Sequence, residues 1–143
     1  SMGAATVFMA SGEDLPGNVK AVIADCGYTS EWDEFRREAD ALHIPWFPVL
    51  NATSVLSKIR DGYDFKQASA LAQVKKSHIP TLFIHGSSDE LVPYSMLGEL
   101  YAAAACEKEE LTVEGAGHAL SSSVAPTLYW RTVEDFIAKH LDR

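Results

Sequence analysis

The stretch at residues 79–93 decides the fold, and it reads IPTLFIHGSSDELVP. Residues 81–84 form a short apolar run behind a proline, which is typical of a buried strand. A glycine-containing turn follows, and Pro93 stands where we expect the first position of a helix. The apolar residues of that helix recur at spacings of three and four: Met96, Leu97, Leu100, Tyr101 and Ala104. The stretch is therefore predicted to run from strand through turn to helix.

The same alternation extends over the rest of the chain. The pattern predicts a helix over 2–10, strands over 19–24 and 110–114, and a last helix from about residue 124. Strands that alternate with helices predict parallel strands joined by right-handed crossovers, so we expect an α/β sheet with flanking helices on both faces. Helical patterns at 30–74 interrupt the alternation, and we interpret them as an inserted helical cap. Pro45 and Pro48 are expected to break its helical pattern, which resumes near residue 52. Residues 1–143 are thus predicted to be a single, partial α/β domain.

Composition narrows the classes of function. A chain of 143 residues, 47% of them apolar, is large enough for one core. The net charge of −8 and the lack of a Lys/Arg cluster argue against nucleic acid as a partner. Cys26 and Cys106 fit no metal-ligand spacing, and two buried thiols are favoured over a disulfide. No metal or cofactor is expected. No apolar run reaches the ~20 residues of a membrane span, and the compartment stays open.

Two polar residues follow predicted strands. Asp89 comes after the strand at 81–84, and His118 follows the next strand in a loop flanked by Gly115 and Gly117. The carboxyl ends of parallel strands meet at one edge of a sheet, where functional groups gather. The carboxylate could orient the imidazole as a general base. Alternatively, Asp89 caps the following helix or holds a turn, and His118 is an ordinary loop residue. Of the other four histidines, His85 at a strand end is expected to be a structural hydrogen-bonding residue, and those at 43, 78 and 140 to be solvent-exposed.

Ser1 is the candidate nucleophile for such a base. The residues Ser1-Met2-Gly3 match the last three positions of a G-x-S-x-G nucleophile elbow, in which the amide of the next residue, here Met2, faces the oxyanion. A different origin for Ser1-Met2 is a remnant of tag removal. In a rival mechanism the free amine of Ser1 is the base. That mechanism leaves Asp89 and His118 without a role, and acetylation of the amine would stop it.

Four motifs together resemble the C-terminal part of an α/β-hydrolase, close to bacterial serine esterases and aminopeptidase-like serine hydrolases. They are SMGAA at 1–5, DCGYTS at 25–30, the stretch at 79–93, and GAGH at 115–118. The resemblance implies a Ser1–Asp89–His118 triad that hydrolyses a small-molecule ester or, less readily, an amide or peptide. The chain departs from the family because no strand precedes the elbow and no second oxyanion amide is present.

Two expectations concern surfaces. Trp32, Trp46 and Phe47 lie in the cap segment, where they line a substrate pocket or simply fill the core. A partial sheet exposes an unpaired edge, expected at the 19–24 strand or the first helix, which favours self-association or pairing with an N-terminal half. The rival to an enzyme is therefore a catalytically incomplete association module. A monodisperse monomer at high concentration would argue against it.

Overall fold

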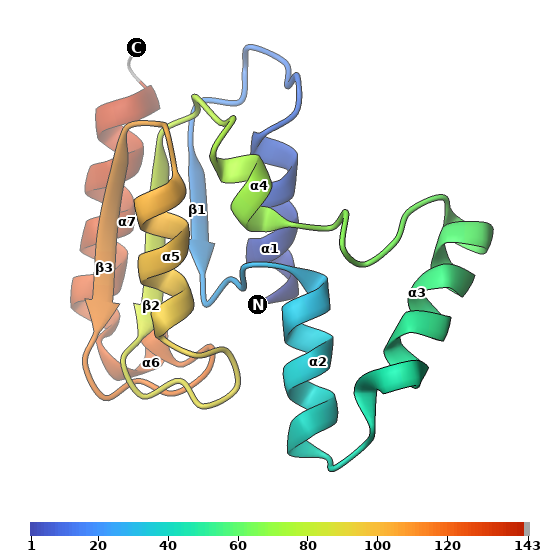
Figure 1. Ribbon diagram of the computed structural model, residues 1–143. Helices are drawn as coiled ribbons and strands as arrows, with labels where there is room; N and C mark the ends of the chain where they lie inside the picture. Colours follow the sequence, from blue (N-terminus) through green and yellow to red (C-terminus); the bar gives the residue numbers. More distant parts are fainter. Residues whose placement is uncertain (142–143) are drawn as a thin grey trace.

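The computed structural model describes residues 1–141 (Figure 1). Its elements are α1 (Met2–Ser11), β1 (Val22–Asp25), α2 (Glu31–Ala41), α3 (Trp46–Asp61), α4 (Ala70–Val74), β2 (Thr81–Gly86), α5 (Ser95–Ala103), β3 (Lys108–Val113), α6 (Ser121–Val124) and α7 (Pro126–Leu141). The three strands form one parallel sheet in the order β1-β2-β3. The parallel α/β sheet predicted from the alternation is confirmed.

Helices cover both faces of this sheet. In Figure 1, α5 lies in front of the strands, α7 lies behind them, and α1 and α4 lie beside β1. Core contacts place α1, α4 and α5 together, with Phe83 of β2. Side chains along β2 alternate between the two layers, as the two-residue period of a strand requires. Phe83 packs with Phe8 of α1, whose ring centroid is 5.0 Å away, while Leu82 and Ile84 pack with Phe136 of α7. The fully buried β2 is therefore the centre of the core.

The segment predicted as a cap protrudes from the sheet as α2 and α3 (Figure 1). Ser30 caps α2, because its Oγ accepts a hydrogen bond from the Asp33 amide at 3.1 Å. The predicted range of 30–74 also includes α4, but Ala70 and Val74 belong to the core formed with α1. The protruding part thus ends before α4.

Several element boundaries differ from the sequence prediction. The cap helix was expected to resume near residue 52, but α3 begins at Trp46 with a non-helical Phe47 in its first turn. Pro48 is tolerated there because the first amides of a helix have no intrahelical acceptor. The helix behind Pro93 begins two residues later, at Ser95. His140, expected to be exposed, is buried against Phe136 because the last turn of α7 faces the sheet.

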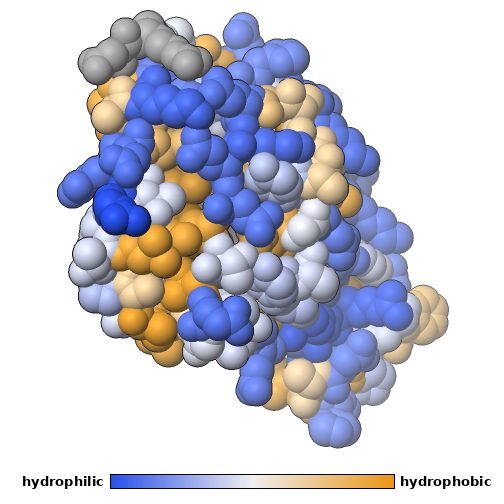
Figure 2. Space-filling model, turned by 90° about the vertical axis from the view of Figure 1, so that its left-hand side faces the viewer, coloured by the Kyte–Doolittle hydropathy of each residue, from blue (hydrophilic) through white to orange (hydrophobic). Residues whose placement is uncertain are grey.

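The two sheet edges differ in character. Figure 2 shows the side that carries β3 and α7, where an apolar band is bordered by hydrophilic residues. The charged residues Lys108, Glu109 and Glu110 lie on β3 itself, and such side chains discourage edge pairing. The outer edge of β1 is apolar and has no strand partner within residues 1–141. Pairing at this edge stays a prediction. No helix in the described part of the chain is long and apolar enough to cross a membrane.

Candidate active site

Asp89 and His118 meet at the carboxyl edge of the sheet. His118 Nδ1 lies 2.9 Å from Asp89 Oδ2, and the loops that carry the two residues follow β2 and β3. The Asp89 side chain is fully buried, whereas 23% of the His118 side chain is exposed. A buried carboxylate thus orients an imidazole that is still reachable from solvent, which is the geometry of a general base and its orienting acid.

Local backbone contacts hold Asp89 in place. Its Oδ1 accepts hydrogen bonds from the amides of Leu91 (3.0 Å) and Val92 (2.9 Å), so the residue also forms the turn that leads to α5. The predicted alternative, a turn-holding role, is therefore present together with the contact to His118. His85 lies beneath the pair: its Nε2 is 3.0 Å from the Val92 carbonyl oxygen and 3.3 Å from Asp89 Oδ2.

The two loops are fastened to each other along their backbones. Ser88 N donates to the Ala116 carbonyl at 3.0 Å, and Gly115 N donates to Ser87 Oγ at 2.8 Å. At Gly86 the loops approach so closely that a Cβ atom would overlap the Ala116 carbonyl oxygen. Glycine is therefore required at this strand end, and the close approach sets the separation of Asp89 and His118.

Ser1 lies at the same edge of the sheet. It is the N-cap of α1, so the amide of Met2 is among the first N–H groups of that helix, which have no intrahelical acceptor. The main-chain nitrogen of Ser1 is within hydrogen-bonding reach of the Cys26 thiol. The donor atoms of Cys26, Asp89 and His118 lie within 4.8 Å of one another. Cys26 thus connects the start of α1 to the Asp89–His118 pair.

Cys26 directly follows β1 in a strained conformation. Its φ is +53°, and Ala119, next to His118, has a φ of +56°. Non-glycine residues in this region each cost on the order of 1–3 kcal/mol and cluster at functional sites. Burial raises the pKa of the Cys26 thiol. Cys26, like Asp89 and His118, follows the carboxyl end of a strand, so its position after β1 is a signal in the sequence that could have identified it.

Helix α2 of the cap segment contacts the loop that carries Asp89. Arg37 donates to the Glu90 carbonyl at 3.4 Å and pairs with Glu34 at 3.2 Å. Burial raises the pKa of Glu34, and Arg37 opposes the rise. His118 is also close enough to act on the Glu34 charge. The cap helix therefore borders the loop that carries Asp89.

Asp25, at the end of β1, anchors the segment that follows His118. Its Oδ1 accepts a hydrogen bond from the fully buried Ser121 at 3.1 Å, and Tyr129 of α7 is a second partner. Burial, followed by the Asp25 charge, raises the pKa of Tyr129 to about 12. These partners were out of reach for sequence reasoning, because they lie almost a hundred residues further along the chain.

Asp25→Asn is expected to make stability less dependent on pH. Burial raises the pKa of Asp25, so the folded state binds this proton more tightly than the unfolded state does. Stability is then highest below the unfolded-state pKa and is lost as pH rises through the higher folded-state pKa. The free energy of unfolding of the variant should therefore increase relative to that of the native protein as pH rises between these two pKa values. Urea unfolding between pH 4 and 7 measures the two free energies of unfolding, with the exposed Asp135→Asn as control. A variant that loses stability relative to the native protein as pH rises contradicts the prediction.

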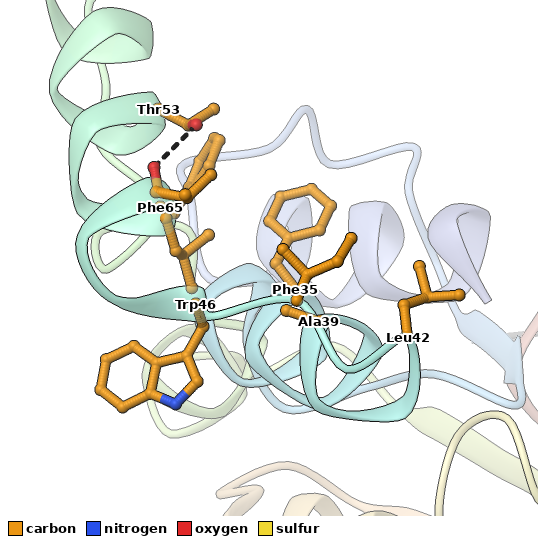
Figure 3. Close-up of a pocket in the computed structure, with 9 residues that line it drawn as sticks. Phe35, Ala39, Leu42, Trp46, Thr53 and Phe65 are labelled. Atoms are coloured by element: carbon orange, nitrogen blue, oxygen red, sulfur yellow. Dashed lines mark hydrogen bonds between the residues drawn. The ribbon is translucent and has the colours of Figure 1, made fainter.

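The aromatic residues predicted to bind substrate occupy three different surroundings. An apolar cavity of about 280 Å³ lies between α2 and α3, and Trp46 is part of its wall together with Phe35 and Leu42 (Figure 3). Trp32 instead packs under Lys66, whose Nζ is 4.5 Å from the ring centroid. Phe47 is 66% exposed and does not line the cavity. The structure does not gather the three residues around one pocket.

Comparisons with known proteins agree with this architecture. The model of the prolyl oligopeptidase family matches residues 1–143. The uncharacterized protein YqkD of Bacillus subtilis is 31% identical over 140 residues, which are 96% of this chain and 45% of YqkD. The uncharacterized protein Rv2307c of Mycobacterium tuberculosis is 33% identical over 81 residues, 57% of this chain and 25% of that protein. The chain thus spans less than half the length of these curated relatives.

Solved structures show the same fold at low sequence identity. An esterase of Pyrococcus furiosus superposes with a TM-score of 0.70 at 18% identity, over 99% of this chain and 52% of the esterase. An acylaminoacyl peptidase of Pyrococcus horikoshii gives 0.67 at 18% identity, over 99% of this chain and 23% of the peptidase. The fold is that of the α/β-hydrolases. With a family match along its whole length, the chain belongs to the prolyl oligopeptidase family.

Proposed function

We propose that this chain carries the triad of a serine hydrolase that cleaves a carboxylic ester, or less readily an amide or peptide, by acyl transfer. The observation that carries the proposal is the buried Asp89 carboxylate, 2.9 Å from Nδ1 of a partly exposed His118. The start of α1, which bears Ser1, is linked to this pair through Cys26. Membership of a family named for peptidases adds support.

In the proposed reaction, His118 takes the proton from Ser1 Oγ as that oxygen bonds to the substrate carbonyl carbon. Asp89 keeps the imidazole oriented and stabilises its positive charge. The Met2 amide donates to the carbonyl oxygen while negative charge develops on it. The bond to the leaving alcohol or amine then breaks, and His118 returns the proton to that group. Water repeats the sequence on the acyl group held by Ser1 and releases the acid. The steps need no metal or cofactor.

Labelling with a fluorophosphonate tests the proposal on the full-length protein. The reagent phosphonylates an activated serine and loses fluoride, so mass spectrometry of the digested protein should find the adduct on the peptide that contains Ser1. Heat-unfolded protein is the control, because an unassembled triad does not activate a serine. An adduct on any other serine, or none on folded protein that hydrolyses acyl esters, contradicts the assignment of Ser1.

Among the three predicted substrate-binding aromatics, we propose that Trp46 contacts the acyl part of the substrate. It alone of the three lines the apolar cavity between α2 and α3. Trp46→Ala should raise KM for a long-chain acyl ester by about 10-fold or more, since apolar contacts in pockets discriminate by about 1–3 kcal/mol. KM for an acetyl ester should change little. Trp32→Ala is the matched control, and equal effects of the two variants on both esters contradict the proposal.

A further inference from the structure

We infer that Cys26, Asp89 and His118 form a binding site for a zinc-type divalent cation, and that this cation reversibly switches the hydrolase off. One thiol, one carboxylate and one imidazole lie with their donor atoms within 4.8 Å of one another. Sulfur, nitrogen and oxygen donors of these three kinds are the ligands that proteins use for zinc. The spacing of the residues along the chain had predicted no such site, because the three donors come from three separate strand ends.

The geometry requires only a small adjustment to accept the ion. Donor atoms in a tetrahedral zinc site stand roughly 3.5 Å apart, given metal–ligand distances of about 2.0–2.3 Å. The three donor atoms now lie up to 4.8 Å apart, and bringing them to this spacing takes side-chain shifts on the order of 1 Å. His118 can supply them, because it is the exposed member of the set and directly follows the loop glycines Gly115 and Gly117. Asp89 is already immobilised by the Leu91 and Val92 amides, which orient a carboxylate ligand in the way outer partners do in metal sites.

Binding is a proton-for-metal exchange without any redox step. The Cys26 thiol gives its proton to solvent as sulfur bonds to the cation. The His118 Nδ1 proton moves through solvent to Nε2, so that Nδ1 and the Asp89 carboxylate exchange their hydrogen bond for two bonds to the metal. Solvent or Ser1 Oγ can take the fourth position. A metal-bound His118 can no longer serve as the base for Ser1. This consequence for activity rests on the proposed function, whereas binding of the ion does not.

Cobalt gives a readout that is independent of catalysis. Co²⁺ takes zinc-like N, O and S ligands, and its bond to a thiolate produces a charge-transfer absorption in the near ultraviolet. Titration of the full-length protein with Co²⁺ should produce this absorption, and added Zn²⁺ should displace it. Cys26→Ala should abolish it, and Cys26→Ser provides a near-isosteric second variant whose fold is checked by circular dichroism. Cys106→Ala is the matched control, since that thiol precedes β3 at the opposite edge of the sheet.

Fluorophosphonate labelling then reads the effect on the reactive serine. Saturating Zn²⁺ should block labelling of the native protein and of Cys106→Ala, and a chelator should restore it. Each Cys26 variant is compared with itself, with and without zinc: whatever its labelling in the absence of metal, zinc should not lower it. Metal affinity should be weakened by more than about 100-fold, because loss of outer partners alone costs about 10–100-fold.

Each outcome decides one part of the inference. A thiolate absorption that is missing from the native protein, or that persists in Cys26→Ala and disappears in Cys106→Ala, overturns the site. An absorption that depends on Cys26, combined with labelling that zinc does not change, overturns the switch and leaves the site. If no serine is labelled even without metal, the proposed function fails, while the cobalt titration still reports on the site.

Discussion

Replacing Ser1 by alanine is expected to lower kcat/KM for an acyl ester by about 10⁴–10⁶-fold, the usual consequence of removing a triad nucleophile. The loss should appear in kcat, because Ser1 makes its bond to the substrate only during the reaction. Folding should be preserved, since the Ser1 side chain makes no cap hydrogen bond with α1. Steady-state kinetics of the full-length protein, together with its melting temperature, measure the effect.

The control for Ser1→Ala is Ser123→Ala, which removes an exposed hydroxyl from α6 near the His118 loop. This variant should keep native kinetics. Activity of Ser1→Ala within about tenfold of the native value would show that another group is the nucleophile, because a triad without its serine loses far more. Full activity after acetylation of a free Ser1 amine would separately exclude that amine as the base.

Asp89→Asn should lower kcat by about 10⁴-fold while the fold is retained. The asparagine Oδ1 can still accept the hydrogen bonds that Leu91 and Val92 now donate to Asp89. Its amide nitrogen, however, would face His118 Nδ1 as a donor, which forces the imidazole into the tautomer that cannot accept the Ser1 proton. Nearly all of the loss should therefore come from the reaction step, with little change in KM.

The cap provides a closely matched control for this variant. Asp64 also accepts hydrogen bonds through Oδ1 from the amides two and three residues ahead, those of Lys66 and Gln67, both at 3.1 Å. Asp64→Asn should therefore reproduce any effect on turn stability, on the order of 1 kcal/mol, and leave kcat unchanged. Equal kinetic losses in the two variants would assign Asp89 to structure alone.

Much of the fold could be predicted because the pattern is local. The apolar run at 81–84 and the helical spacing behind it are properties of neighbouring residues, and they correctly predicted β2 and α5. The predictions were wrong where contacts between residues far apart in the chain determine burial or a helix boundary. His140 reads as a polar residue near a chain end, yet the sheet buries it. The beginning of α3 at Trp46 was missed because prolines were read only as breaks, although the first turn of a helix tolerates them.

The candidate site also has a part that could be predicted from sequence and a part that could not. Asp89 and His118 were singled out from sequence because strand ends in a parallel sheet share one edge, and the structure brings them to 2.9 Å. The proximity of Cys26 could not be read from spacing, nor could the contact between Asp25 and Ser121. Both depend on which strands are neighbours and on the close approach at Gly86, which is a contact between backbones.

The sequence by itself determined that this protein is a parallel α/β sheet with an acid and a histidine at its carboxyl edge. Periodicity and turn residues carry that information within short windows of chain. Only the tertiary structure decided that a thiol joins this pair, that α4 belongs to the main core, and that Trp46, but not Trp32 or Phe47, is among the residues that line the apolar cavity. Distances across a sheet are set by strand order and register, and these come from the packing of residues that lie far apart in the chain.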